Sequence, residues 1–176
     1  MDKVMILAIG NAGGNIVEAI RRETKHAEMK KTQYVFADCN EKDDLRKREA
    51  AGEKIVLLDI CSDSFPVDVF KDATKLIIVV GLGGQTGTKF VKLAATAAKD
   101  AGVEDIKVVA TIPFIFEGED KVQYAVSAAQ RLSAIGGLKL SVFNNDELMT
   151  KYPDLNFFNA FETADKEIGD IISKLK

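Results

Sequence analysis

The segment LIIVVGLGGQTGT, residues 76–88, joins a short apolar run to a turn rich in glycine and threonine. The next residues are apolar at helical spacing: Phe90, Leu93, Ala94 and Ala97. Glycines let the backbone curl so that several N–H groups point at one anion, and the start of the following helix adds the positive end of its dipole. The segment predicts a strand, a turn suited to a phosphate, and a helix. Thr86 and Thr88 are candidate hydroxyl donors or helix caps.

The same alternation of strand and helix extends along the chain. Continuous apolar runs predict strands at residues 4–9, 33–37, 54–58, 76–80, 107–112 and 138–143. Helical patterns separate several of them, and one helix runs from about Asp120 to a stop at Gly136 and Gly137. Strands that are apolar on both faces and alternate with helices are typical of a parallel sheet covered on both sides. We therefore expect an α/β fold: a doubly wound, mainly parallel, Rossmann-like sheet in a three-layer α/β/α domain spanning residues 1–176.

Composition limits the classes of function. The chain has 176 residues, of which 47% are hydrophobic and 29% charged, which is typical of one globular domain. Its net charge of -3 argues against binding to nucleic acid or anionic lipid. Asp2 and Lys3 lead straight into a strand-like run, and no apolar stretch approaches the ~20 residues of a membrane span. We expect a cytoplasmic protein with no signal peptide.

The cysteine and histidine residues of the sequence give little support for a metal site or for catalysis by a thiol. The two cysteines, Cys39 and Cys61, have neither zinc-site nor CxxC spacing, so we expect structural or incidental thiols. The single histidine, His26, lies in a polar stretch without a second histidine nearby. A solvated surface side chain explains His26 better than a metal ligand or a catalytic base.

A second glycine-rich stretch, GNAGGN at residues 10–15, follows the first predicted strand. In the common doubly wound order the first and fourth strands are neighbours where the strand order reverses, so both glycine stretches would face one crevice. That arrangement favours a di- or triphosphate, whereas each stretch alone could be only a tight turn. Neither stretch is a Walker A or a regular GxGxxG motif. Asp38, at the end of the second strand, could hold a ribose diol, which leaves an NAD-type oxidoreductase as the lowest-ranked alternative.

Taken in order, five segments resemble the nucleotide-contacting segments of the FtsZ/tubulin family. They are GNAGGN (10–15), GLGGQTGT (81–88), PFIFEG (113–118), NND (144–146) and FNAFETAD (158–165). The resemblance covers nearly the whole chain but only the N-terminal, GTP-binding half of the family's fold. It implies a guanine nucleotide, GTP or GDP, with Mg²⁺ as the accompanying ion and no metal site built from protein side chains.

The resemblance also assigns roles to individual residues. The implied phosphate-binding residues are Gly10, Asn11, Gly13, Gly14, Gly81, Gly83, Gly84, Gln85, Thr86, Gly87 and Thr88. The implied ribose- and base-binding residues are Asn15, Pro113, Glu117, Lys121, Asn145, Phe161 and Asp165. Lys121 stands where the family has an arginine, so the charge is kept and the planar fork is lost.

Asp165 is the implied reader of the base, and Phe161 the ring that packs on it. A carboxylate that accepts two parallel N–H bonds selects guanine over adenine, whose edge has a different order of donors and acceptors. Core packing alone would also explain Phe161, because it continues an apolar helical stripe with Ala164 and Ile168. Asp165 at the margin of that stripe could equally be a surface acid.

Two departures from the family bear on activity. Residues 59–70 (DICSDSFPVDVF) are too few for the family's glycine-rich loop and helix at the terminal phosphate, so we expect weak discrimination between GTP and GDP. The acids of this segment could repel a triphosphate unless Mg²⁺ intervenes: Asp59, Asp63 and Asp68.

The chain ends at Lys176, inside or just after the helix that leads to the family's second domain, which carries a catalytic acidic loop. The last helix has one apolar and one polar side, which predicts a natural single-domain relative without that second domain. We therefore expect at most a weak GTPase that needs a catalytic acid from a partner, either a second copy or a full-length FtsZ-like protein. The alternative is an interaction protein that has lost nucleotide binding and regulates the assembly of full-length relatives.

Overall fold

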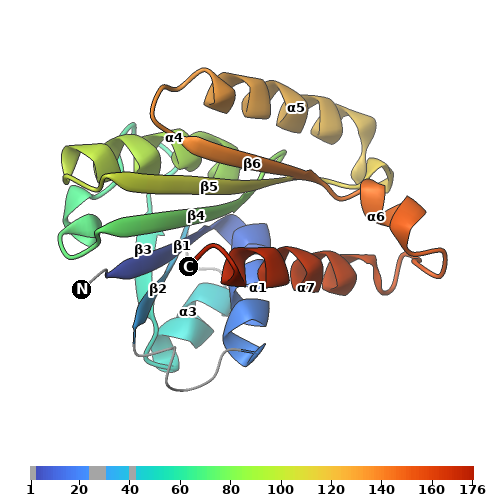
Figure 1. Ribbon diagram of the computed structural model, residues 1–176, viewed down its shortest axis with the longest axis horizontal. Helices are drawn as coiled ribbons and strands as arrows, with labels where there is room; N and C mark the ends of the chain where they lie inside the picture. The colour runs from blue at the N-terminus through green and yellow to red at the C-terminus, as the bar shows by residue number, and fades with distance from the viewer. Residues whose placement is uncertain (1–2, 24–30, 40–42) are drawn as a thin grey trace.

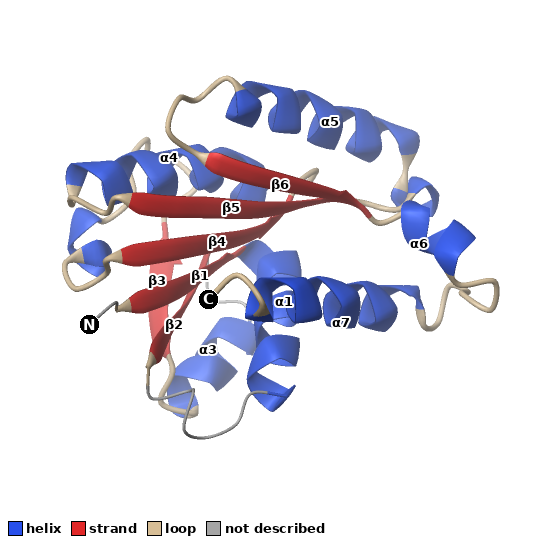
Figure 2. Ribbon diagram, viewed as in Figure 1, coloured by secondary structure: helices blue, strands red, loops and turns tan. Residues whose placement is uncertain are grey.

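The computed structural model describes residues 3–23, 31–39 and 43–176. Within these residues six parallel strands form one sheet with helices on both faces (Figures 1 and 2). The strands are β1 (Val4–Ile9), β2 (Thr32–Cys39), β3 (Lys54–Leu58), β4 (Lys75–Gly81), β5 (Asp105–Ile112) and β6 (Lys139–Asn144). The helices are α1 (Gly10–Glu23), α3 (Asp43–Ala50), α4 (Gln85–Asp100), α5 (Glu119–Ser133), α6 (Glu147–Lys151) and α7 (Ala160–Ser173). Two short 3-10 turns, η1 (Val67–Phe70) and η2 (Ile115–Glu117), complete the described elements.

The sheet has the strand order β3-β2-β1-β4-β5-β6, which confirms the doubly wound topology expected from the sequence. The order reverses between β1 and β4, which pair in parallel with Ile9 opposite Val80. The carboxyl ends of these two strands therefore meet at one edge of the sheet. In open α/β sheets this position is where ligands bind.

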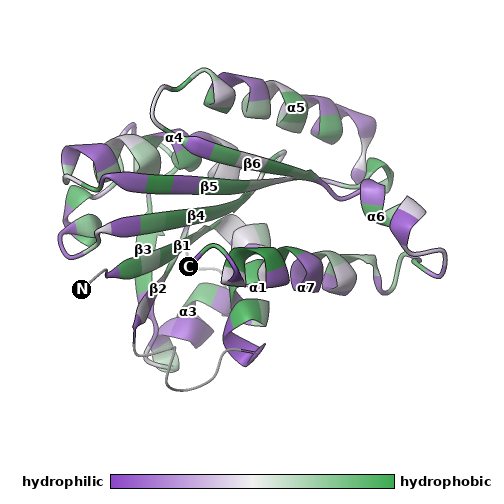
Figure 3. Cartoon of the chain, in the orientation of Figure 1, coloured by the Kyte–Doolittle hydropathy of each residue, from purple (hydrophilic) through white to green (hydrophobic). Residues whose placement is uncertain are grey.

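Side chains of β1 alternate between two buried clusters, as the period of a strand requires. Met5 and Leu7 pack into the cluster that also holds the buried residues of α4 and α5. Ile6 and Ala8 pack into the cluster on the other face, with α1, α3 and α7. Figure 3 shows the hydrophobic strands between helices whose outward residues are hydrophilic. The three-layer α/β/α arrangement is confirmed.

Predicted strands agree with the observed ones to within about two residues, and residues 4–9 and 54–58 agree at both ends. The sequence did not predict α3, α6 or the two 3-10 turns. In α3 only Leu45 is buried among the residues whose burial is described. A helix with one buried side chain has no apolar periodicity to reveal it.

GNAGGN was expected to be a turn, and that expectation is wrong: α1 begins at Gly10, so the whole stretch lies in the helix. Gly10 makes the change of direction alone, with a φ of 73° that a residue with a side chain rarely adopts. The strand passes into the helix without intervening loop residues. The start of α1 is thereby fixed beside the carboxyl end of β1.

Helix α7 packs on α1 with the apolar side that the sequence predicted. Ala164, Ile168 and Ile172 are buried, whereas Glu162 and Asp170 are exposed. Phe161 is an exception to the predicted stripe, because 44% of its surface is exposed. Core packing therefore does not account for Phe161.

Candidate nucleotide site

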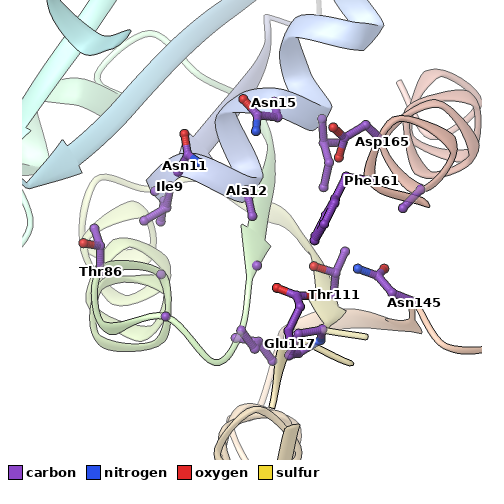
Figure 4. A pocket seen from close by; sticks show the side chains of 18 of the residues that line it. Ile9, Asn11, Ala12, Asn15, Thr86, Thr111, Glu117, Asn145, Phe161 and Asp165 are labelled. Atoms are coloured by element: carbon purple, nitrogen blue, oxygen red, sulfur yellow. The ribbon is translucent and has the colours of Figure 1, made fainter. Parts of the chain in front are cut away.

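A cavity of about 420 Å³ lies at the carboxyl ends of β1, β4 and β5, between the starts of α1 and α4 and the side of α7. Most of the site residues named from the sequence line this cavity: Gly10, Asn11, Asn15, Gly81, Gly84, Gln85, Thr86, Gly87, Pro113, Glu117, Lys121, Asn145, Phe161 and Asp165. Figure 4 shows Asn11 and Thr86 toward one end and Phe161, Asp165 and Asn145 toward the other. Five segments far apart in the sequence thus border one cavity, and the two glycine stretches face it together as expected.

The end of the cavity with Asn11 and Thr86 is built from the starts of two helices. The N-cap of α4 is Gly84, and no side chain hydrogen-bonds to the first amides of this helix. The first amides of a helix have no intrahelical acceptor, and the helix dipole makes that end positive. A Cβ placed on Gly10 would lie 3.6 Å from the backbone nitrogen of Gly87, so α1 and α4 start in close contact. This end of the cavity is suited to an anion.

Gly83 and Thr88 do not line the cavity; they hold the loop that precedes α4. The Gly83 N–H donates to Thr88 Oγ1 at 3.1 Å, and Gly83 has a φ of 95°. A Cβ on Gly83 would lie 3.0 Å from Lys121 Cγ. The Thr88 hydroxyl therefore braces the loop, while Thr86 is the threonine whose side chain borders the cavity.

Gly13 and Gly14 also lie off the cavity, in the second turn of α1. A Cβ on Gly13 would lie 2.4 Å from the carbonyl oxygen of Val79 in β4, so this glycine allows the helix to approach the strand. A Cβ on Gly14 would lie 2.5 Å from Nη1 of Arg48. The packing of α1 on β4 therefore requires glycine at position 13, whereas at position 14 the close atoms belong to the end of the Arg48 side chain, which can move.

Glu117 and Lys121 form part of the wall opposite α1. Glu117 Oε2 accepts a hydrogen bond from the Phe114 backbone N–H at 2.9 Å, and Oε1 accepts one from Lys121 Nζ at 2.8 Å. Both carboxylate oxygens of Glu117 are thus engaged within the protein. A ribose hydroxyl would share these oxygens with the existing donors.

Two polar groups at the other end lack partners. Asn145 donates its backbone N–H to Ile112 O at 3.0 Å, but its side-chain Oδ1 is buried without a hydrogen-bond donor. Asp165 is half-buried, and none of the described residues hydrogen-bonds or ion-pairs with its carboxyl group. Burial, followed by the nearby charge of Glu162, raises the pKa of Asp165 to about 7. Buried acceptors normally have donors, so this end of the cavity is incomplete by itself.

Phe161 lies beside these acceptors with one edge held by other rings. Its centroid is 5.6 Å from that of Phe114 and 5.8 Å from that of Phe116, with nearly perpendicular planes in both pairs. Phe114 is fully buried and fixes the arrangement. Phe161 is therefore an anchored ring with surface left for a planar ligand.

The cavity also has lining residues that sequence reasoning missed: Ile9, Ala12, Ile16, Leu82, Thr111, Ala164 and Ile168. Thr111 is the polar one, 4% exposed, near the carboxyl end of β5. A polar residue at the carboxyl end of a predicted parallel strand is the signal that would have found it.

Residues 59–70 lie outside the cavity lining. Lys89 ties this segment to the second turn of α4, by donating to Ile60 O and by pairing with Asp63 at 3.5 Å. Asp68 pairs with Lys71 at 2.6 Å, and Asp59 accepts the backbone N–H of Cys61. None of these three acids lines the cavity, and the expected repulsion of a triphosphate stays a prediction.

Asp38 does not line the cavity. Its side chain is 8% exposed, and Oδ1 accepts the backbone N–H of Cys39 at 2.7 Å. The role of Asp38 in an NAD-type site thus has no geometric support. Cys39 is buried and Cys61 exposed, both as free thiols, whereas His26 lies outside the described residues.

Across residues 3–23, 31–39 and 43–176 there is no group of three or more His, Cys, Asp or Glu side chains that could hold a metal ion. The helices of the same part of the chain are too short or too polar to cross a membrane.

The fold and the cavity at its switch point define a Rossmann-like α/β domain. No protein-family profile matches the chain. The cell division protein FtsZ of Porphyromonas gingivalis is 24% identical over 186 residues, covering 94% of this chain and 39% of that protein. FtsZ of Aquifex aeolicus is 31% identical over 123 residues, covering 70% of this chain and 31% of that protein. The solved FtsZ dimer of M. jannaschii has a TM-score of 0.77 at 20% identity, covering 99% of this chain and 54% of that one.

These sequence and structural similarities together place the chain in the FtsZ/tubulin family, with the fold of the family's N-terminal GTPase domain. The chain spans only about a third to a half of the length of these relatives. The resemblance stated from the five sequence segments is confirmed.

Proposed function

We propose that this chain binds a guanine nucleotide in the cavity between α1, α4 and α7. The observation that carries the proposal is the polarity of the cavity. Uncapped helix amides lie at one end, and the unpartnered acceptors of Asn145 and Asp165 lie at the other. A nucleotide has the opposite order of groups, since its phosphates accept hydrogen bonds and guanine presents N–H donors.

In this arrangement the phosphates lie against Gly10, Asn11 and the first turn of α4. The ribose lies near Glu117 and Thr111, and the base packs on Phe161. Asp165 accepts the N1–H and 2-amino group of guanine, while Asn145 Oδ1 accepts a further N–H or hydroxyl. Mg²⁺ would be held by the phosphates, with side-chain oxygens such as that of Thr86 as candidate partners.

We further propose that GTP and GDP bind with similar affinity. The segment 59–70, which would have to sense a terminal phosphate, is tied to α4 by Lys89 and does not reach the cavity. A third phosphate would thus extend toward solvent with few new contacts.

We propose that the chain alone hydrolyses GTP slowly at most. Among the described lining residues the only carboxylates are Glu117, beside Thr111 at the proposed ribose position, and Asp165, toward the base end. No carboxylate is left at the phosphate end to activate water. A partner, either a second copy or a longer FtsZ-like protein, would have to supply that group.

The test is a calorimetric titration with GTP, GDP and ATP, with and without Mg²⁺. We expect saturable binding of both guanine nucleotides, with affinities within about threefold of one another, and much weaker binding of ATP. Asp165→Leu removes both carboxylate oxygens and should lower guanine affinity by about 10- to 100-fold.

Asp170→Asn, an exposed site on the same helix that lies outside the cavity lining, is the matched control and should bind like the parent. If none of the nucleotides gives a binding heat, the proposal is refuted. The better description would then be the alternative, an interaction protein that keeps the fold but has lost nucleotide binding.

A further inference from the structure

Asp165 separates the cavity from a second groove on the outside of the molecule. It lines both spaces, as does Asn15 of α1. The second groove runs between α1 and α7. Asp165 therefore borders the candidate ligand cavity on one side and the outer groove on the other.

The charges around Asp165 leave it without a cation of its own. From α1, Arg22 faces the outer groove but is 2.9 Å from Glu18 Oε1. Across the cavity, Lys121 is committed to Glu117 at 2.8 Å.

The remaining charged groups beside Asp165 are Glu162 and Lys166 of α7 and Glu23 of α1. None of the described residues forms an ion pair or hydrogen bond with the Asp165 carboxyl. Burial and the like charge of Glu162 thus favour the protonated form, and they raise the pKa of Asp165 to about 7.

The two protonation states of this side chain offer different hydrogen-bonding groups. The carboxylate has two acceptor oxygens, which match the N1–H and 2-amino donors of guanine. The protonated carboxyl has one donor and one acceptor, so its O–H would face a donor of guanine. A protonated Asp165 therefore cannot make both bonds.

We propose that a proton on Asp165 controls the base selectivity of this site. This proton must dissociate before the side chain can accept both N–H hydrogen bonds from guanine, and we call this control the gating of the site. The inference rests on the proposed guanine site and adds its regulation by pH. Guanine binding releases the proton, because two N–H donors stabilise the carboxylate. Guanine affinity accordingly rises with pH through neutrality and levels off above it.

The size of the effect follows from the ionised fraction of Asp165. With a pKa of about 7, about a tenth of the empty sites carry the carboxylate at pH 6 and about nine tenths at pH 8. GDP affinity should therefore rise about tenfold between these values. Close to one proton should be released per GDP bound at pH 6, and close to none at pH 8.

The experiment measures GDP binding calorimetrically from pH 6 to pH 8 in buffers of different ionisation enthalpy, for the parent and for Asp165→Asn. The phosphates of GDP also titrate in this range, and using one ligand for both proteins cancels their contribution. Asparagine keeps one acceptor oxygen and cannot ionise. We expect the parent to gain about tenfold more affinity than Asp165→Asn over this interval.

Glu162→Gln provides a second variant outside the cavity lining. Removing the neighbouring negative charge should move the midpoint of the parent's pH profile toward lower pH. Carboxyl NMR of the unliganded parent should show Asp165 titrating near neutrality, which also covers the case of an unstable Asp165→Asn protein.

Parallel pH profiles for GDP binding to the parent and to Asp165→Asn would overturn the gating and leave the nucleotide site intact. Titration of Asp165 in the ordinary carboxyl range would overturn it as well. Failure of the parent to bind GDP at any pH would overturn both the site and its gating.

Discussion

Replacing Gly13 with alanine tests whether this glycine is required by the packing of α1 or by a ligand. A Cβ at this position would lie 2.4 Å from Val79 O, 3.2 Å from Val79 C and 3.5 Å from Val80 Cα. Ordinary contacts of this kind begin near 3.4 Å, so α1 and β4 would have to separate locally by about 1 Å. Both partners are backbone atoms of regular elements, so no side chain can move aside to relieve the contact.

The cost can be bounded from two opposing contributions. Overpacking of a close-packed interior costs about 1–3 kcal/mol, and the rigid carbonyl of Val79 places Gly13→Ala toward the upper part of that range. Alanine in a helix regains up to about 1 kcal/mol over glycine. We expect a net loss of about 1–2 kcal/mol, which lowers the melting temperature of a domain of this size by about 2–8 °C.

Urea denaturation of the nucleotide-free protein is the assay, because it excludes any contribution from a ligand. Gly136→Ala is the matched control, since a Cβ there meets no atom within 4 Å. If Gly13 served only to present its backbone amide to a phosphate, alanine would keep that amide. An unfolding free energy of Gly13→Ala within about 0.5 kcal/mol of the parent would therefore refute the packing argument.

Three further changes give distinct outcomes. Gly14→Ala should cost less than about 1 kcal/mol in urea denaturation, because the clashing atom is the end of the Arg48 side chain, which can move. Thr88→Val should cost about 1–2 kcal/mol and weaken nucleotide binding by disordering the loop, whereas Thr88→Ser should keep the bond to the Gly83 N–H and behave as the parent. Asp165→Asn should stabilise the empty protein at pH 8 and not at pH 3. The pKa of Asp165 in the folded protein, about 7, exceeds the ordinary aspartate value of 3.8, so stability is lost as pH rises between the two values. Solvent screening reduces the full equivalent of about 4 kcal/mol to about 1–2 kcal/mol, measurable as a pH-dependent difference in urea midpoint.

The strands and their order could be predicted because the information is local. Residues 76–80 are apolar without alternation, and a run of that kind bounded by glycine is typical of a strand buried on both faces. Once strands alternate with helices, right-handed crossovers leave few possible strand orders. The observed order β3-β2-β1-β4-β5-β6 is the commonest of them.

The roles of individual glycines could not be predicted in the same way. What Gly13 does depends on its distance to Val79, a residue far along the chain, and sequence periodicity contains no such distance. The sequence grouped Gly13 with Gly10 because both belong to GNAGGN, whereas the structure places only Gly10 at the cavity. Thr111 was missed for a related reason, since a threonine in a strand is ordinarily there for its β propensity.

The two carboxyl groups of the cavity differ in whether the protein itself supplies their hydrogen-bond donors. Glu117 receives a backbone N–H and the Lys121 ammonium, so its hydrogen-bonding capacity is largely used to shape the wall. Asp165 receives none from the described residues, although it is half-buried beside Glu162. A half-buried carboxyl without hydrogen-bond partners lowers the stability of the protein without a ligand. N–H donors on a ligand would replace the hydrogen bonds to water that burial removed. In the proposed guanine site, the same unmet hydrogen bonds that make Asp165 unfavourable without a ligand would be the source of selectivity for a base with two adjacent N–H donors.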